Sequence, residues 1–277
     1  MKFFLSAVAL IVLAGNLVSC QTPAIDDRRI TLSFTEDVDL TQDDYLKHLT
    51  TWMENSFGNV EDISVDGQTV TLTFTNVVTK IGVGIFSNCS SLTSITLPNS
   101  VLMIGDRAFQ SCSSLTTISI PNSVKKIGYA AFADCESLTS ITIPKSVSKI
   151  GDGAFLGCSS LTSVTIPDSM TEIGDGAFES CSSLTSISIP NSVTQIGDYA
   201  FYNCSSLTSI TISNSVTQIG NWAFMGCSSL TSVTIPNSVT QIGFWAFRGC
   251  PLESVTVPRS AEISDYSFEE TTSVIYR

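Results

Sequence analysis

Apolar and polar positions along most of this chain follow one pattern that returns every 23 residues. Each copy opens with L-x-x-I-x-L, seen first over residues 92–97. Ile95 and Leu97 share one side of an extended segment, because successive side chains of a strand point to opposite faces. Ser94 and Thr96 share the other side. The pattern predicts a short strand with its apolar face inward, ended by a proline that cannot donate to a ladder.

The second half of each copy predicts a tight turn. Val101 and Ile104 point inward, and Ala108 and Phe109 follow on a helical or 3₁₀ turn. A glycine separates the two pairs in every full copy, at positions 105, 128, 151, 174, 197, 220 and 243. Such a glycine indicates either a left-handed backbone or a close approach of neighbouring segments. A fixed period of this length is typical of stacked units, whose long surfaces mostly serve in binding.

A cysteine marks the same place in every copy, at positions 89, 112, 135, 158, 181, 204, 227 and 250. Stacked repeats lie about 4.8 Å apart, within reach of a disulfide. A column of identical side chains points one way, however, so buried free thiols are the favoured interpretation. One potential ligand per repeat also disfavours zinc.

The first residues resemble an export signal. Residues 3–15 are almost unbroken apolar sequence after one early charge, too few to span a bilayer. They lead to L-V-S-C at 17–20, which resembles the bacterial lipobox, in which the cysteine becomes lipidated and forms the new N-terminus. Ordinary signal cleavage nearby is the alternative. We predict a signal peptide over 1–19, a lipid on Cys20, a tether over 20–29, and membrane attachment through that lipid.

Residues 30–75 differ from the repeats and predict a small β-α-β-β unit. Alternation over 30–35 indicates a half-buried strand, and a helical pattern with capping residues follows over 41–57. Asp66-Gly67 predicts a hairpin turn between two further strands. The unit would cover the first open edge of the stack, because terminal repeats need a cap.

The repeats are predicted over 76–249, beginning in degraded form before seven full copies. The copy over 250–277 is broken. It has lost a residue after Cys250, and Ser264 stands where glycine is expected. This segment is predicted to cap the C-terminal end of the stack.

Charge and composition exclude several function classes. The net charge is −12, and eleven carboxylates between residues 21 and 66 face only three basic side chains. This balance argues against nucleic-acid binding, which depends on Lys and Arg contacts to phosphates. The single histidine, His48, lies in the predicted helix, and no phosphate loop or metal-ligand spacing is present. We predict a non-enzymatic protein without a cofactor or a metal.

The repeated phrase resembles the BspA-type leucine-rich repeat of bacterial surface proteins. The resemblance covers residues 76–268 and rests on C-x-x-L-x-x-I-x-L-P from Cys89 and I-G-x-x-A-F from Ile104. It implies a solenoid of short parallel strands joined by turns or 3₁₀ segments, displayed at the cell surface for adhesion to host or neighbouring-cell components. One departure is a serine at 100, 123, 146 and onward, where the general pattern has Asn or Cys. A serine ladder must therefore replace the usual asparagine ladder.

Positions that vary between copies are the candidates for function. The residue before Ala-Phe becomes aromatic towards the C-terminus, and the position two after that Ala becomes bulky. Phe244 adds to them at a position that is usually Asp. Aromatic residues with arginine are typical of binding hot spots. An aromatic ladder that only stiffens the stack is the equal alternative. The candidate ligand-binding residues are Tyr199, Tyr202, Trp222, Met225, Phe244, Trp245 and Arg248.

The outward Ser and Thr residues of the predicted strands form a regular lattice, beginning with Ser94 and Thr96. Such a lattice can bind glycans or resemble the Thr arrays of ice-binding solenoids, but a plain solvated face is the favoured interpretation. The whole sequence predicts an exported outer-membrane or cell-surface lipoprotein that binds an extracellular protein or glycan. A structural envelope spacer without a specific ligand is the competing hypothesis, and ice binding is a remote one.

Overall fold

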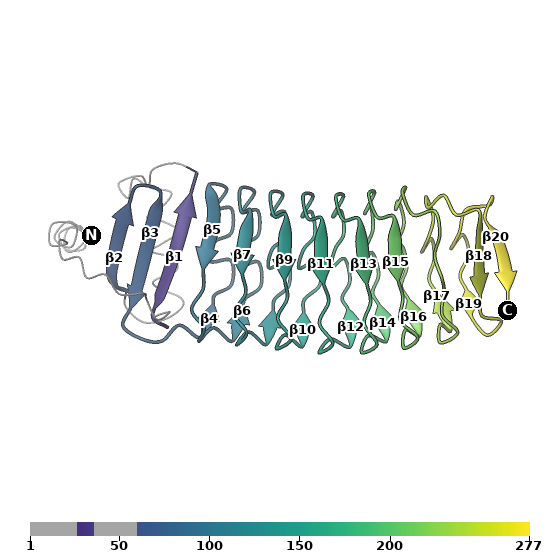
Figure 1. Cartoon of the computed structure of the whole chain (residues 1–277), viewed down its shortest axis with the longest axis horizontal. Coiled ribbons are helices and arrows are strands. Elements are labelled where there is room, and N and C mark those ends of the chain that lie inside the picture. The colour runs from purple at the N-terminus through teal and green to yellow at the C-terminus, as the bar shows by residue number, and fades with distance from the viewer. Residues whose placement is uncertain (1–26, 36–59) are drawn as a thin grey trace.

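A computed structural model describes residues 27–35 and 60–277. Within them the chain winds into a β-solenoid whose turns advance along one axis (Figure 1). One set of strands comes from the L-x-x-I-x-L segments: β5 (Leu92–Thr96), β7 (Thr117–Ser119), β9 (Ser140–Thr142), β11 (Ser163–Thr165), β13 (Ser186–Ser188) and β15 (Ser209–Thr211).

A second set follows half a turn later. It consists of β4 (Lys80–Ile81), β6 (Met103–Ile104), β8 (Lys126–Ile127), β10 (Lys149–Ile150), β12 (Glu172–Ile173), β14 (Gln195–Ile196), β16 (Gln218–Ile219), β17 (Gln241–Ile242) and β19 (Glu262–Ile263). Paired strands of both sets run parallel, with residues 23 apart opposite one another up to β17. The described residues contain no helix, so hydrogen-bonded turns occupy the place of the expected helical or 3₁₀ turn.

The inward positions of the pattern form one continuous core, as predicted. Ile95, Val101, Ile104 and Phe109 are buried, and so are their apolar equivalents except Ile210, Val233 and Ile263, which are partly buried against the same core. The phenylalanine rings from Phe86 onward stack along the axis, with centroids 5.0–5.5 Å apart. Each turn therefore buries its apolar side against the next, which explains why a single repeat cannot stand alone.

The serine ladder is confirmed. The hydroxyl of Ser100 donates to the carbonyl oxygen of Val78 at 2.7 Å, and that of Ser123 donates to Val101 at 2.6 Å. Each bond satisfies a carbonyl of the preceding turn. Ser192 is an exception: its Oγ is buried and has no hydrogen-bond partner among the described residues.

The repeated glycine is required by a close approach rather than by a left-handed backbone. A Cβ on Gly151 would lie 2.4 Å from the amide nitrogen of Tyr129 and 2.6 Å from the carbonyl carbon of Gly128. Neither atom can move without shifting the preceding turn. The left-handed residue of this turn lies two positions later, at Gly153, where φ is 61°.

The repeat cysteines are free thiols, and all but the half-buried Cys89 are buried. Each buried thiol donates to a phenylalanine carbonyl oxygen 26 residues earlier, as Cys158 does to Phe132 at 3.2 Å. Burial raises the pKa of the Cys158 thiol to about 12. These thiols therefore contribute to the core as small apolar groups.

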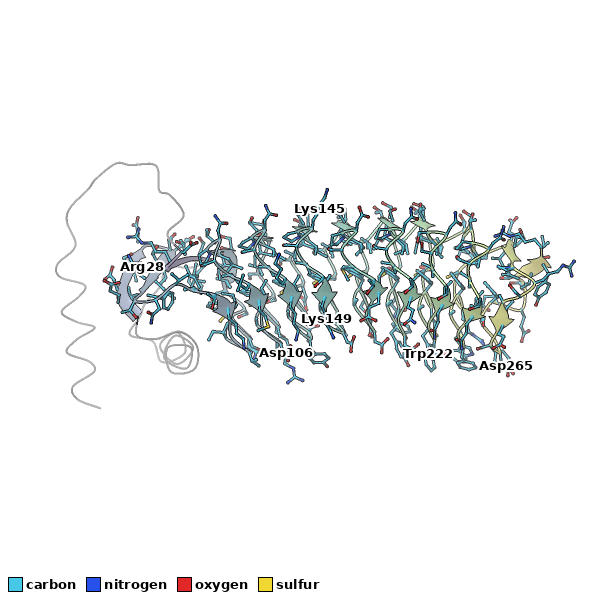
Figure 2. All side chains as sticks on the ribbon, turned by 90° about the horizontal axis from the view of Figure 1, so that it is seen from below. Arg28, Asp106, Lys145, Lys149, Trp222 and Asp265 are labelled. Carbon is cyan, nitrogen blue, oxygen red and sulfur yellow. The ribbon has the colours of Figure 1, made fainter. Side chains whose placement is uncertain are left out.

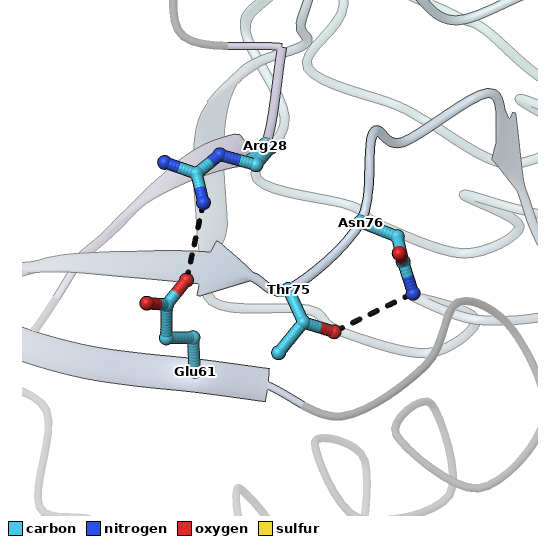
Figure 3. Close-up of polar contacts among 4 residues, drawn as sticks. All are labelled: Arg28, Glu61, Thr75 and Asn76. Carbon is cyan, nitrogen blue, oxygen red and sulfur yellow. Dashed lines mark hydrogen bonds and ion pairs between the residues drawn. The ribbon is translucent and has the colours of Figure 1, made fainter.

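The N-terminal strands form an antiparallel extension of the first ladder. β1 (Arg29–Phe34) lies between β3 (Thr69–Phe74) and β5, and β2 (Val60–Asp66) forms the outer strand. The predicted hairpin joins β2 to β3 through Gly67, at a φ of 54°. Arg28 pairs with Glu61 across this sheet at 3.3 Å, close to Thr75 and Asn76 where the sheet leads into the solenoid (Figure 3).

The predicted signal peptide, Cys20 and the helix over 41–57 lie outside the described residues. At the other end of the solenoid, β18 (Ser254–Val257) pairs in parallel with β20 (Ser273–Tyr276). The side chain of Arg277 holds this end to the preceding turn, because its Nε donates to Asn237 Oδ1 at 2.7 Å.

Candidate functional site

One edge of the solenoid is formed by the turns that follow the second set of strands. The residue before each Ala-Phe pair has a left-handed backbone in these turns, with φ between 49° and 61°. Earlier turns place Gly84, Arg107, Ala130, Gly153 and Gly176 there. Later turns place Tyr199, Trp222, Trp245 and Tyr266 at the same position. Figure 2 shows Trp222 on the same long edge as Asp106 and Asp265, away from Lys145.

Backbone hydrogen bonds hold these strained residues in place. The amide of Trp222 donates to the carbonyl oxygen of Phe244 in the next turn at 2.9 Å, and the amide of Met225 donates back to Trp222 at 3.1 Å. A left-handed backbone costs a residue other than glycine about 1–2 kcal/mol. The large rings therefore occupy this edge at an energetic cost that the neighbouring turns offset.

The structure brings the first three aromatic candidates into contact. The rings of Tyr199 and Trp222 stack with centroids 4.8 Å apart and planes 7° apart. Tyr202 meets Tyr199 edge-on at 5.7 Å. Each ring thus covers part of its neighbour and leaves a rim towards solvent.

Phe244 links Trp222 to Trp245. It meets Trp222 edge-on at 5.6 Å and stacks on Trp245 at 5.1 Å. The guanidinium of Arg248 lies 4.7 Å from the Trp245 ring centroid, a cation–π contact. Met225 is half-buried on the same turn as Trp222. The sequence predicted one column of Tyr199, Trp222 and Trp245, whereas Phe244 contacts both tryptophans and joins them.

Tyr266 is a member of this cluster that the sequence reasoning missed. It is 58% exposed and its ring lies 6.1 Å from that of Phe244. The signal was present in Asp265-Tyr266-Ser267-Phe268, which matches D-x-A-F of the full repeats except that serine replaces alanine. We call the following set of residues the aromatic edge: Tyr199, Tyr202, Trp222, Met225, Phe244, Trp245, Arg248 and Tyr266.

Carboxylates form a separate row beside the middle turns. Asp175 Oδ1 accepts from the amide of Asp198 at 2.8 Å, and Asp198 Oδ1 accepts from Asn221 at 2.7 Å. Asn221 Oδ1 then takes the place of a carboxylate and accepts from the amide of Phe244. The row of acids is interrupted at Asn221 and Phe244, where the aromatic rings gather, and resumes at Asp265 beside Tyr266. Arg248 supplies the positive charge among the rings.

The described residues hold no group of three side chains suited to a metal ion. Nor does the described part of the chain contain a helix long and apolar enough to cross a membrane. The geometry offers instead a half-exposed apolar ridge with one cation. Such a ridge suits binding rather than acid–base chemistry.

The profile of the BspA type leucine-rich repeat region matches residues 65–174 and 148–275. The chain belongs to this family. A leucine-rich repeat protein from Bacteroides ovatus is 30% identical with a TM-score of 0.62, over 81% of this chain and 64% of its own length. This BspA-type chain thus spans less than two thirds of that relative.

Two further solved structures are similar. The leucine-rich repeat protein of T. pallidum is 35% identical with a TM-score of 0.54, over 57% of this chain and 74% of its own. One from Eubacterium ventriosum, 23% identical with a TM-score of 0.51 over 64% of this chain and 44% of its own, shares the fold. No curated protein matches this BspA-type chain. Leucine-rich repeat solenoids are typically binding scaffolds, and their extended surfaces suit that use.

Proposed function

We propose that this protein is a non-enzymatic, lipid-anchored protein of the cell surface whose aromatic edge binds an extracellular protein or glycan. The observation that carries the proposal is the contiguous cluster of partly exposed rings, in which Tyr199 stacks on Trp222 and Phe244 contacts Trp222 and Trp245. Gly153 shows that the turn needs no ring, and Arg107 and Ala130 have the same left-handed backbone without such a cluster. A contiguous exposed apolar patch is typical of an interaction site.

The ring geometry favours a protein partner. Tyr199 and Trp222 cover each other's faces, so ring rims point outward. Ring rims carry partial positive charge, and Arg248 adds a full one beside Trp245. Backbone carbonyl and carboxylate oxygens of a protein segment would complement both, while its apolar side chains would cover the rest of the ridge.

The position of the aromatic edge along the solenoid fits surface display. Residue 27 begins the described chain at the end that carries β1 to β3, whereas the aromatic turns lie towards β17 to β20 (Figure 1). A lipid on Cys20 would therefore hold the N-terminal end near the membrane and leave the aromatic edge farther out. This placement supports contact with molecules outside the cell.

The test is a binding screen of protein 21–277 against immobilised extracellular-matrix proteins and a glycan array. The double variant Trp222→Ala/Trp245→Ala is expected to bind about 1,000-fold more weakly, as the removal of two hot-spot residues at about 2 kcal/mol each implies. Tyr129→Ala is the matched control, because Tyr129 is an exposed aromatic residue on the same edge, far from these tryptophans along the chain.

Equal binding by the wild type and the double variant would contradict the proposal. So would equal losses in the double variant and in Tyr129→Ala. Failure of the folded wild-type protein to bind any probe would instead support the structural envelope spacer.

A further inference from the structure

A groove of about 560 Å³ crosses three repeats where β11, β13 and β15 end. One wall is a row of outward hydroxyls from the strands, and the other is a row of carboxylate and amide side chains from the turns that follow. Buried Ile166, Ile189 and Ile212 line its apolar part. The polar side chains are Thr165, Ser188, Thr211, Asp168, Asn191 and Asn214.

The groove forms where the repeat departs from its own pattern. The residue that ends each strand is proline at 98, 121, 144, 167, 190, 236 and 258, but it is Ser213 in this copy. The smaller side chain leaves Pro190 half-buried, whereas the other prolines of the column are buried. Ser213 Oγ donates to the Pro190 carbonyl oxygen at 3.0 Å, so the hydroxyl folds back instead of filling the space.

A second departure lies in the same groove. The turn position after the strand-ending residue is asparagine in most copies, lysine at 145 and arginine at 259. Asp168 is the one carboxylate at this position. No lysine or arginine lines the groove. A carboxylate without a cation offers strong acceptors to neutral donors and repels anions.

We propose that this groove binds a segment of a neutral oligosaccharide laid along the solenoid axis. Sugar hydroxyls both donate and accept, as do the Ser, Thr and Asn side chains of the two walls, and Asp168 accepts from two donors. The isoleucine and proline side chains contact the apolar faces of the sugar rings. The volume lies in the range of ligand sites, about 300–1,000 Å³.

The repeat spacing fits an extended polymer. Successive turns offer equivalent hydroxyl groups and equivalent amide or carboxylate groups, and the paired strands β13 and β15 lie about 4.8 Å apart. Each sugar unit can therefore meet one side chain of each wall. A peptide is disfavoured, because an added strand needs a free sheet edge and this groove lies over side chains. The site is distinct from the aromatic edge and does not rest on the function proposed for it.

Two substitutions that restore the repeat pattern test the proposal without threatening the fold. Ser213→Pro refills the column, and Asp168→Asn restores the usual amide. Asn237→Asp is the matched control, because it places a carboxylate at the same position in a repeat outside the groove. Circular dichroism and urea unfolding would establish that each variant is folded.

The measurement is affinity gel electrophoresis of protein 21–277 in gels containing hydroxyethylcellulose, xylan, mannan or a β-glucan, with anionic hyaluronan as a further probe. We expect retardation by at least one neutral polysaccharide and none by hyaluronan. Ser213→Pro should abolish it, and Asp168→Asn should weaken it about tenfold, the value of one charge-assisted hydrogen bond. Asn237→Asp and Trp222→Ala/Trp245→Ala should bind as the wild type does.

No retardation of the wild type by any neutral probe would overturn the proposal. Undiminished binding by Ser213→Pro would do the same. Loss in Trp222→Ala/Trp245→Ala but not in Ser213→Pro would assign the sugar to the aromatic edge instead.

Discussion

The variant Trp222→Gly should be more stable than Trp222→Ala, although alanine is usually the less destabilising of the two residues. Both changes remove the same ring contacts, including the 4.8 Å stack on Tyr199, so these losses cancel in the comparison. Only the backbone term remains. At a φ of 54°, alanine carries the left-handed cost of about 1–2 kcal/mol that glycine avoids. Glycine has the greater conformational entropy in the unfolded chain, which favours the stability of the alanine variant by about 0.4–1 kcal/mol.

The difference leaves Trp222→Gly more stable than Trp222→Ala by about 0.5–1 kcal/mol. Urea unfolding of protein 21–277, followed by circular dichroism, would measure it as a shift in midpoint at constant slope. Met225→Gly and Met225→Ala serve as controls on the same turn, where φ is not positive. There alanine should be at least as stable as glycine. The reasoning fails if Trp222→Ala is the more stable variant, or if both pairs show the same order.

Three further results are expected. Gly151→Ala should lower the free energy of unfolding by about 3 kcal/mol or more, because its Cβ would lie 2.4 Å from the Tyr129 amide, whereas Gly153→Ala should cost about 1 kcal/mol; similar urea midpoints would refute the distinction. Phe155→Ala should cost about 3–5 kcal/mol by opening the phenylalanine stack, measured in the same assay. Because burial raises the pKa of Cys158 from 9.0 to about 12, its contribution to stability should be constant below pH 9 and fall between pH 9 and 12, where the unfolded thiol ionises first; a midpoint unchanged up to pH 11 would contradict this.

The solenoid could be predicted from the sequence because every level of the repeat agrees. The strand alternation at Ile95, the inward Phe109 and the serine at position 100 each follow from local chemistry repeated at a fixed step. Stacking then brings equivalent residues together without any long-range search. The glycine at 105 was consistent with either a left-handed backbone or a close approach of neighbouring turns. The short distances between adjacent turns show that close approach is the reason.

The details of the aromatic edge and the groove could not be predicted in this way. The left-handed backbone under Trp222 depends on turn geometry, which the glycines at 153 and 176 indicated only indirectly. Phe244 lies against both tryptophans because of side-chain packing that a column alignment does not describe. The groove arises from the single replacement at Ser213, which leaves Pro190 of the preceding turn half-buried instead of buried.

Tryptophan fluorescence would test the role of the aromatic edge most directly. The chain has three tryptophans, of which Trp222 and Trp245 belong to the aromatic edge. In a Trp52→Phe variant, only Trp222 and Trp245 would contribute to the tryptophan emission. Titration with a protein or glycan identified by the binding screen should shift their emission and protect them from acrylamide quenching. Saturable binding that leaves both emission and quenching unchanged would contradict the account.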